Sequence, residues 1–183
     1  DDYFQSGLFT IARRRILWLL ILVLANGLTT KVIAMNDQIL KEIVLLAAFI
    51  PLLIGTGGNV GAQSSTVVIR GLSTQKLKSL GAFKAVTKEA ITGALLGVLM
   101  MLVVFPFAWW QGEGPLIASA VGISLISITT LAATVGAILP LLFDKMGLDP
   151  ALMSSPFITT VTDIAGVFIY LSTANWLLNS SIL

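Results

Sequence analysis

One acidic residue stands apart from the others in this chain of 183 residues. Eight of the nine acidic side chains lie at the ends of apolar stretches or between them, whereas Asp163 lies inside one. It follows Leu152, where that stretch begins, by 11 residues, which is roughly 16 Å along a helix. A carboxylate at this depth in a bilayer costs at least about 2.5 kcal/mol. The residue could bind a mobile cation that supplies the missing charge, or hydrogen-bond between helices as a protonated acid.

The neighbours of Asp163 favour the cation. At the period of a helix, the stripe that contains Asp163 is small or polar and the opposite stripe is apolar. The first stripe holds Ser155, Thr159, Asp163, Gly166 and Tyr170, and the second holds Phe157, Val161, Ile164, Phe168 and Leu171. We therefore expect residues 152–178 to form a helix with a hydrated face towards a pore, where Ser155 and Thr159 help to bind the ion, and a dry face towards lipid.

Residues 51–66, PLLIGTGGNVGAQSST, form the second unusual segment. Its proline removes one helical donor, and its four glycines let the backbone approach a neighbour closely or leave the helix. We expect glycine to interrupt a helix here, so that carbonyl and amide oxygens face a hydrated cation. Close helix packing through a small-xxx-small pattern is the alternative, and the two interpretations are compatible. The candidate pore residues are Pro51, Gly55, Gly57, Gly58, Asn59, Gly61 and Gln63.

The composition places the whole chain in a membrane. Hydrophobic residues make up 56% of it and charged residues only 11%, whereas a soluble domain is about one quarter charged. The chain has no cysteine and no histidine, which excludes disulfides, thiolate metal sites and Ser-His-Asp hydrolysis. An aspartyl protease needs two buried aspartates, and only Asp163 qualifies, so we do not expect an enzyme. The net charge of +2 is too small to indicate a nucleic-acid partner.

Five apolar stretches are long enough to cross a bilayer, which needs roughly 20 residues. They cover about residues 16–35, 43–69, 86–109, 116–143 and 152–178. The linkers between them are short, so residues 1–183 are expected to form a single transmembrane domain. The predicted fold class is an all-α membrane protein with five transmembrane helices per protomer, surrounded by membrane lipid.

The distribution of basic residues predicts the orientation, since positive residues are enriched on the cytoplasmic side. An N-terminus inside and a C-terminus outside give nine basic residues on the cytoplasmic side and two on the other. The nine are Arg13, Arg14, Arg15, Arg70, Lys76, Lys78, Lys84, Lys88 and Lys145, and the two are Lys31 and Lys41. Glu89, beside Lys88, is interpreted as an interfacial charge at a helix start, with a role at the cytoplasmic mouth as the alternative.

Taken together, these segments resemble the membrane domain of the MgtE family of magnesium channels. The resemblance spans essentially the whole chain. It rests on residues 51–66, on Asp149-Pro150-Ala151, Pro156, Thr159-Thr160, Asp163, Gly166 and Tyr170, and on residues 15–19 at the entry to the first helix. It implies a homodimer of five-helix protomers in a prokaryotic inner membrane, with the ion path along the two-fold axis. It also implies cytoplasmic magnesium-sensing domains that precede this part of the protein.

By position, the resemblance assigns Asp163 as the carboxylate that binds hydrated Mg²⁺ in the pore. It assigns backbone carbonyls around Pro51 and Gly58 to the same path, and Asp149 to a Mg²⁺ site near the cytoplasmic mouth that helps hold the gate closed. The expected function is a channel that conducts Mg²⁺ selectively and passively. The alternative is a secondary transporter that uses Asp163 to couple movement of a divalent cation to H⁺ or Na⁺.

Overall fold

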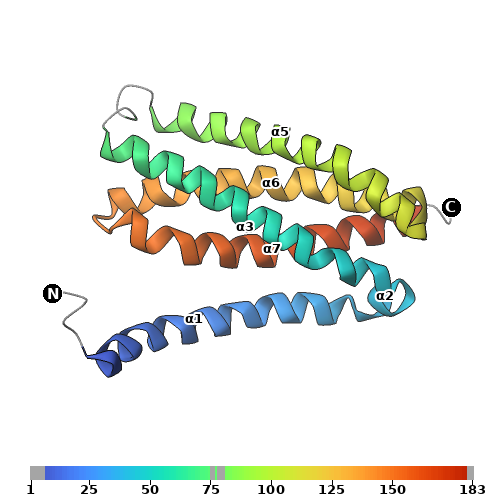
Figure 1. Cartoon of the computed structure of the whole chain (residues 1–183), viewed down its shortest axis with the longest axis horizontal. Coiled ribbons are helices and arrows are strands. Elements are labelled where there is room, and N and C mark those ends of the chain that lie inside the picture. Colours follow the sequence, from blue (N-terminus) through green and yellow to red (C-terminus); the bar gives the residue numbers. More distant parts are fainter. Residues whose placement is uncertain (1–6, 75–76, 78–80, 181–183) are drawn as a thin grey trace.

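The computed structural model describes residues 7–74, 77 and 81–180, and within that part of the chain all regular structure is helical. The five long helices run in alternating directions along one bundle (Figure 1). In chain order the elements are α1 (Leu8–Met35), α2 (Asp37–Glu42), α3 (Val44–Ser73), α5 (Ala82–Ala108), the π-helix η2 (Trp109–Glu113), α6 (Gly114–Lys145) and α7 (Pro150–Ser180). The predicted all-α class is confirmed.

Four of the described helices are long and apolar enough to cross a membrane. They are α3, α6, residues Ala82–Gln111 of α5 and η2, and residues Ser154–Asn179 of α7. The predicted ranges 43–69, 86–109, 116–143 and 152–178 agree with these helices to within four residues at each end. Helix α1 carries a shorter apolar run, Leu19–Met35, within its 28 residues. The chain is therefore a multi-pass helical membrane protein.

Helix α3 is continuous, and the predicted interruption by glycine is wrong. The helix runs without a break from Val44 to Ser73, through Pro51 and all four glycines of the segment. A glycine inside a helix costs only about 1 kcal/mol relative to alanine. Unwinding at membrane depth would cost several kcal/mol for each backbone group left without a partner. The helix therefore persists, and its glycines serve contact with neighbouring helices instead.

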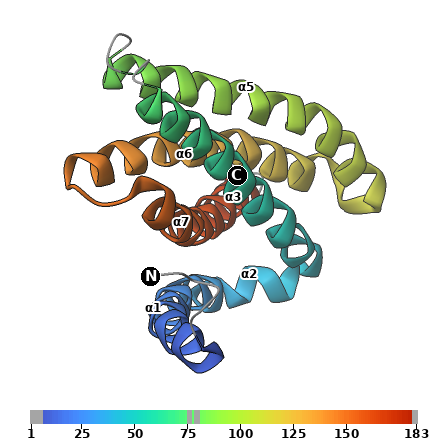
Figure 2. The same cartoon turned by 60° about the vertical axis from the view of Figure 1, so that its left-hand side comes forward.

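Helix α6 is the centre of the bundle and packs against α3, α5 and α7 (Figures 1 and 2). Small residues bring its backbone close to its neighbours. A Cβ atom built on Gly93 of α5 would lie 2.5 Å from the carbonyl oxygen of Thr129 on α6. A Cβ atom on Gly136 of α6 would overlap the carbonyl group of Gly61 on α3. The backbones of α3 and α6 thus touch directly where these two glycines meet.

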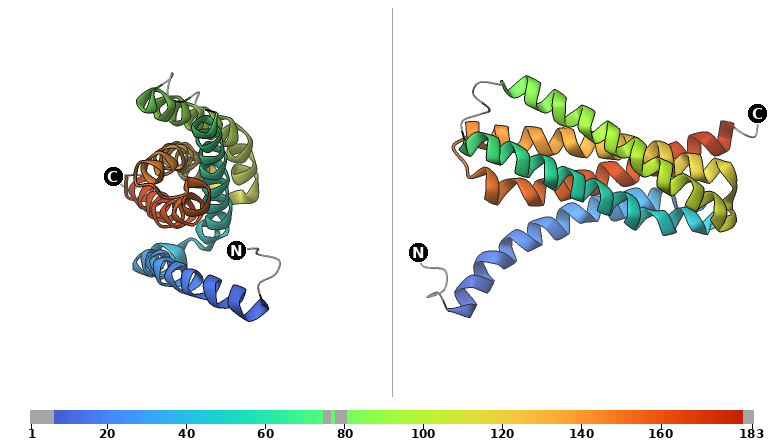
Figure 3. Two further views of the ribbon diagram at one scale, coloured as in Figure 1. Left: turned by 90° about the vertical axis from the view of Figure 1, so that its left-hand side faces the viewer. Right: turned by 45° about the horizontal axis from the view of Figure 1, so that its top comes forward.

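Helix α1 packs on α7, and its N-terminal part lies away from the other helices (Figures 1 and 3). Leu8 and Phe9 are accordingly 88% and 83% exposed. The start of α1, the end of α3, the start of α5 and the turn from α6 to α7 all lie at one end of the bundle (Figure 1). The elements that carry Arg13, Arg70 and Lys145 therefore share one end. Lys76 and Lys78 lie outside the described residues.

Candidate functional site

Asp163 lies near the middle of the apolar part of α7. It follows Ser154, the first residue of that part, by nine residues, or about 14 Å along the helix axis. Its side chain is half-buried, so part of the carboxylate faces out of the protomer. Among the described residues, no hydrogen bond or ion pair to the Asp163 carboxylate is present. The described residues therefore provide no counter-charge for this carboxylate.

The half of the predicted polar stripe that precedes Asp163 on α7 is open, and the half that follows it is closed. Ser155 and Thr159, two turns and one turn before Asp163, are exposed. The Thr159 hydroxyl donates to the carbonyl oxygen of Pro156 at 3.0 Å, which leaves its oxygen lone pairs available to an incoming group. Gly166, one turn after Asp163, is buried, and a Cβ atom there would lie 3.7 Å from Ile128.

Besides Gly166, two residues of α7 differ from the predicted division into hydrated and lipid-facing stripes. Tyr170 is fully buried, and its hydroxyl donates a hydrogen bond to the carbonyl oxygen of Leu46 on α3 at 3.0 Å. Leu171, which we predicted to face lipid, is also fully buried, in a core cluster against which Val32 and Ile33 of α1 pack. The two-stripe pattern fails at this end because α7 is covered there on both sides.

Helix α3 presents a second open row. Pro51, Gly55 and Asn59 follow one another at intervals of four residues and are all exposed, and Gly58 is half-buried beside them. A Cβ atom on Gly55 or Gly58 would meet nothing within 4 Å. Glycine at these places leaves the helix backbone uncovered, so water or a hydrated ion can approach the carbonyl oxygens closely. Gln63 is exposed one turn further along.

The other two candidate glycines of α3 pack against neighbouring helices. A Cβ atom on Gly57 would lie 2.7 Å from a side-chain carbon of Ile128 on α6. On Gly61 it would lie 2.5 Å from Ile158 of α7 and 3.2 Å from the carbonyl oxygen of Ala132. The packing interpretation of the Gly57–Gly61 pair is therefore confirmed, and the glycines of α3 divide into a packed face and an open face.

Pro51 leaves one backbone carbonyl of the open row, that of Ala47, without its helical donor, and the helix still continues. A proline has no N–H, so the carbonyl four residues earlier lacks its helical donor. That residue is Ala47, which is exposed. The carbonyl of the preceding residue, Leu46, also accepts a hydrogen bond from the Tyr170 hydroxyl. The two neighbouring carbonyls of α3 thus differ in their partners. That of Leu46 is bonded to α7, and that of Ala47 is left open.

Asp149 lies at the start of α7 and caps it. Its Oδ1 atom accepts a hydrogen bond from the backbone N–H of Ala151 at 2.9 Å, and Pro150 is the first helical residue. Aspartate followed by proline is a favourable start for a helix, since the carboxylate satisfies a free N–H group and proline needs no donor. The side chain is exposed, at the same end of the bundle as the elements that carry Arg13, Arg70 and Lys145.

Sequence reasoning missed the role of Glu89. Its Oε2 atom accepts a hydrogen bond from the hydroxyl of Ser64 on α3 at 2.8 Å. Ser64 is only 4% exposed, so this contact joins α3 to α5 inside the bundle. We interpreted Glu89 as an interfacial charge at a helix start. Its bond to Ser64 could not be predicted, because nothing in the sequence indicated which face of α3 meets α5.

The described residues contain no group of three or more acidic side chains that could hold a metal ion. A cation near Asp163 must therefore take its remaining ligands from hydroxyls, carbonyls, water or a second copy of the chain. Such a set of hard oxygen ligands suits Mg²⁺ and Ca²⁺ better than the softer transition metals.

Comparison with known families decides the identity of this arrangement. The family model MgtE, described as a divalent cation transporter, matches residues 50–173, which include the open row of α3 and Asp163. The chain belongs to the MgtE family. MgtE is a family of divalent cation transporters. The helices described here therefore form the membrane part of a member of this family.

Three bacterial MgtE proteins, each named magnesium transporter MgtE, are similar over nearly the whole chain. The protein of Thermus thermophilus is 38% identical over 97% of this chain, and that of Enterococcus faecalis is 35% identical over 90%. The protein of Bacillus subtilis is 33% identical over 98%. The alignments cover 39%, 36% and 40% of those proteins, so the chain spans about two fifths of the relatives' length.

Proposed function

We propose that this chain forms the pore of a magnesium channel and conducts hydrated Mg²⁺ passively across the membrane. The observation that carries the proposal is Asp163, a half-buried carboxylate in the middle of α7 with no partner among the described residues. The three relatives named as magnesium transporters support Mg²⁺ as the ion. The chain acts as a transporter and not as an enzyme.

A homodimer completes the site. One carboxylate supplies a single negative charge, whereas the ion carries two positive charges. Two copies of Asp163 across a two-fold axis balance the ion. The open side of α7, with Ser155 and Thr159, supports this arrangement because these polar side chains are exposed in the isolated protomer. The pore therefore lies between the two protomers.

The open row of α3 contributes to the same path. Mg²⁺ gives up its water reluctantly and is bound best by a few oxygens acting partly through that water. The uncovered backbone at Gly55 and Gly58, the Ala47 carbonyl and the Asn59 amide offer such oxygens. Gln63 extends the polar path towards the cytoplasm. Binding through water is weak enough for release, which conduction requires.

Asp149 forms a second ion site at the cytoplasmic mouth. It is exposed, and it is joined to the pore helix through the cap of α7. Mg²⁺ bound there holds the start of α7 in its closed position. The magnesium-sensing domains of the full-length protein precede this membrane part and act on the same end.

The membrane topology that we propose has five crossings, with the N-terminus in the cytoplasm and the C-terminus outside. Helix α1 makes the first crossing, since Leu19–Met35 extends for about 26 Å as a helix. Five long helices that alternate in direction support an odd number of crossings (Figure 1). The end that carries Arg13, Arg70 and Lys145 faces the cytoplasm of a prokaryotic cell.

A secondary transporter is the second candidate. The same isolated carboxylate suits a site at which H⁺ or Na⁺ binding alternates with binding of the divalent cation. The continuous α3 favours the channel, because many transporters of this kind bind their substrates at interrupted helices. Mg²⁺ uptake that follows the membrane potential without any imposed H⁺ or Na⁺ gradient would distinguish the channel.

The test is Mg²⁺ flux into proteoliposomes for the parent protein, Asp163→Asn and Asp144→Asn. Asp144 is an exposed acid at the end of α6 and serves as the matched control. We expect Asp163→Asn to lower the flux by at least about tenfold and Asp144→Asn to leave it unchanged. In calorimetry, the parent should bind about one ion more per two protomers than Asp163→Asn does. If Asp163→Asn conducts as well as the parent, the pore assignment is wrong.

A further inference from the structure

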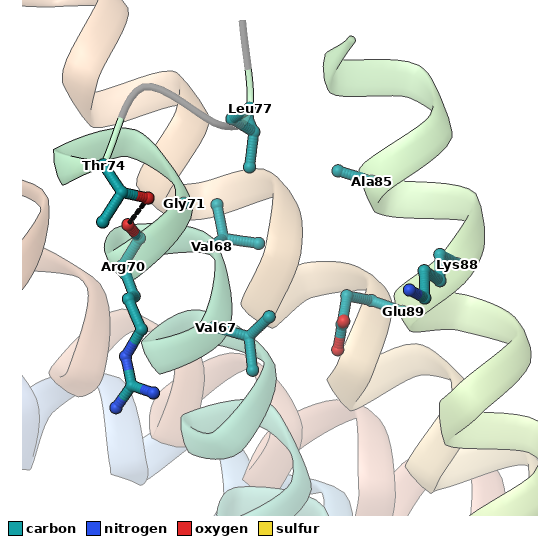
Figure 4. A pocket seen from close by; sticks show the side chains of 9 residues that line it. All are labelled: Val67, Val68, Arg70, Gly71, Thr74, Leu77, Ala85, Lys88 and Glu89. Carbon is teal, nitrogen blue, oxygen red and sulfur yellow. Dashed lines mark hydrogen bonds between the residues drawn. The ribbon is translucent and has the colours of Figure 1, made fainter. Parts of the chain in front are cut away.

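A cavity of about 280 Å³ lies between α3 and α5, away from Asp163, at the end of the bundle where α3 ends and α5 begins (Figure 4). Val67 and Val68 of α3 and Ala85 of α5 give it apolar walls. The hydrogen bond between Ser64 and Glu89 crosses from one helix to the other beside it. The cavity is therefore a pocket with two helical walls, and the proposed ion path does not use it.

The cavity carries charges of both signs. Lys88 and Glu89, which are adjacent on α5, both line it; the Glu89 side chain extends towards α3, whereas that of Lys88 stays close to α5 (Figure 4). Lys88 is exposed and Glu89 is half-buried. The Oε2 atom of Glu89 accepts the Ser64 hydroxyl, which leaves Oε1 for a further donor. Arg70 lines the α3 side, and its guanidinium runs along α3 in Figure 4.

This combination selects among the amphiphiles that surround a membrane protein. An acyl chain alone would place apolar groups against Lys88 and Glu89. A headgroup with phosphate alone would bring a second negative charge towards the Glu89 carboxylate. A headgroup that carries both a phosphate and an ammonium pairs with both side chains, through charge-assisted hydrogen bonds.

The ammonium must also be a primary one. A primary ammonium donates hydrogen bonds to a carboxylate, whereas a quaternary ammonium has no N–H and is recognised by aromatic rings. None of the nine residues that line the cavity in the described structure is aromatic. The lining therefore matches an aminophospholipid better than a choline lipid.

We propose that the cavity between α3 and α5 binds the headgroup of a phosphatidylethanolamine-type lipid. Lys88 binds the phosphate, Glu89 accepts the ammonium, and the glycerol end of the lipid lies against Val67 and Ala85. The lipid belongs to the leaflet on the side where α3 ends. That leaflet is the cytoplasmic one if the proposed topology holds, and the binding itself does not depend on it.

The experiment measures which lipids the protein retains. The protein is placed in nanodiscs with equal amounts of phosphatidylethanolamine, phosphatidylcholine and phosphatidylglycerol, and the retained lipids are identified by native mass spectrometry. We expect about tenfold preference for phosphatidylethanolamine over phosphatidylcholine, the size expected for one hydrogen bond to a charged group. Equal retention of the three lipids would overturn the proposal.

Two variants test the two charges separately. Lys88→Gln should lower the retention of phosphatidylethanolamine and phosphatidylglycerol together, since both carry a phosphate. Glu89→Gln keeps an acceptor for Ser64 and should remove only the preference for phosphatidylethanolamine over phosphatidylglycerol. Ala85→Leu fills the cavity without changing charge and should lower retention of phosphatidylethanolamine, which keeps the proposal testable if Glu89→Gln fails to fold.

Lys84→Gln is the matched control, because Lys84 lies one turn from Lys88 and lines a groove with Phe83 and Ile91, which Lys88 also borders, but does not line the cavity between α3 and α5. Its retention pattern should equal that of the parent. A loss as large as that of Lys88→Gln would move the lipid to this other groove and overturn the proposal. Displacement of the lipid by soluble phosphoethanolamine at equal concentration would also overturn it, since the site would then recognise a free phosphoamine.

Mg²⁺ flux, recorded on the same samples, separates this proposal from the proposed function. A protein that retains phosphatidylethanolamine but conducts no Mg²⁺ would contradict the channel alone. A protein that conducts Mg²⁺ but retains all three lipids equally would contradict the lipid site alone.

Discussion

The hydroxyl of Tyr170 on α7 donates a hydrogen bond to the carbonyl oxygen of Leu46 on α3, at 3.0 Å and in the buried core. Tyr170 lies seven residues, or two helical turns, after Asp163 on the same helix. The bond therefore restrains the rotation of α7 relative to α3. By doing so it sets the direction in which Asp163 faces.

Tyr170→Phe removes this bond and leaves the ring in place. The Leu46 carbonyl would keep its helical partner, so we expect a loss of about 1 kcal/mol in the free energy of unfolding. Looser orientation of Asp163 should also reduce Mg²⁺ flux. Thermal unfolding in detergent and flux in proteoliposomes measure the two effects. A variant that unfolds earlier but keeps full flux would show that the bond serves stability alone.

Gly136→Ala should destabilise the bundle. The added Cβ atom overlaps the carbonyl group of Gly61, and backbone cannot move aside as a flexible side chain can. We expect a loss of about 1–3 kcal/mol, the range for overpacking. The unfolding midpoint in detergent should fall, and an unchanged midpoint would contradict the direct backbone contact of α3 and α6.

Gly55→Ala is the counterpart on the open face of α3. Nothing lies within 4 Å of the added Cβ atom, so the change should raise stability by up to about 1 kcal/mol through helix propensity. The methyl group covers backbone in the proposed ion path, so Mg²⁺ flux should fall at the same time. Higher stability with undiminished flux would remove Gly55 from the pore.

Asp149 has two roles that different substitutions separate. Asp149→Ala removes the cap of α7 and should cost about 1 kcal/mol, whereas Asp149→Asn keeps a capping oxygen and should be near neutral. If Asp149 binds Mg²⁺ at the mouth, both variants should need more Mg²⁺ to close the channel. Single-channel recording over a range of Mg²⁺ concentrations provides the check. If the Asp149→Asn channel closes at the same Mg²⁺ concentration as the parent, Asp149 caps α7 and does not bind Mg²⁺ at the mouth.

Ser64→Ala tests the contact between α3 and α5. The half-buried Glu89 carboxylate would lose a donor, and we expect a loss of about 1 kcal/mol. Ser119→Ala is the control, because the Ser119 hydroxyl is exposed and bonds only to the carbonyl of Pro115 in its own helix. Equal unfolding midpoints for the two variants would show that the Ser64–Glu89 bond adds nothing to stability.

The helices, and the position of Asp163 inside one of them, could be predicted from the sequence. The length of each apolar stretch determines which segments cross the membrane, and this property is local. Asp163 was recognisable for the same reason, since a charge inside such a stretch needs a partner whatever the fold. The all-α class and four of the predicted ranges follow from these local properties alone.

Which face of each helix is buried was harder to predict, because it depends on the neighbouring helices. The helical period placed Tyr170 and Leu171 on opposite stripes, but both are buried where α7 is covered on both sides. The glycines of α3 could equally have indicated a break or close contact. Only the position of α6 shows that Gly61 is packed against a backbone while Gly55 is open.

The direct contact between Gly61 and Gly136 gives α3 a fulcrum. Pro51 lies ten residues to one side of Gly61 and Arg70 nine residues to the other, so the two arms measure about 15 Å and 14 Å. If α3 tilts as a rigid rod about this contact, its two ends move in opposite directions by nearly equal amounts. A displacement of the Arg70 end would then move Pro51, on the other side of the contact, by a similar distance in the opposite direction.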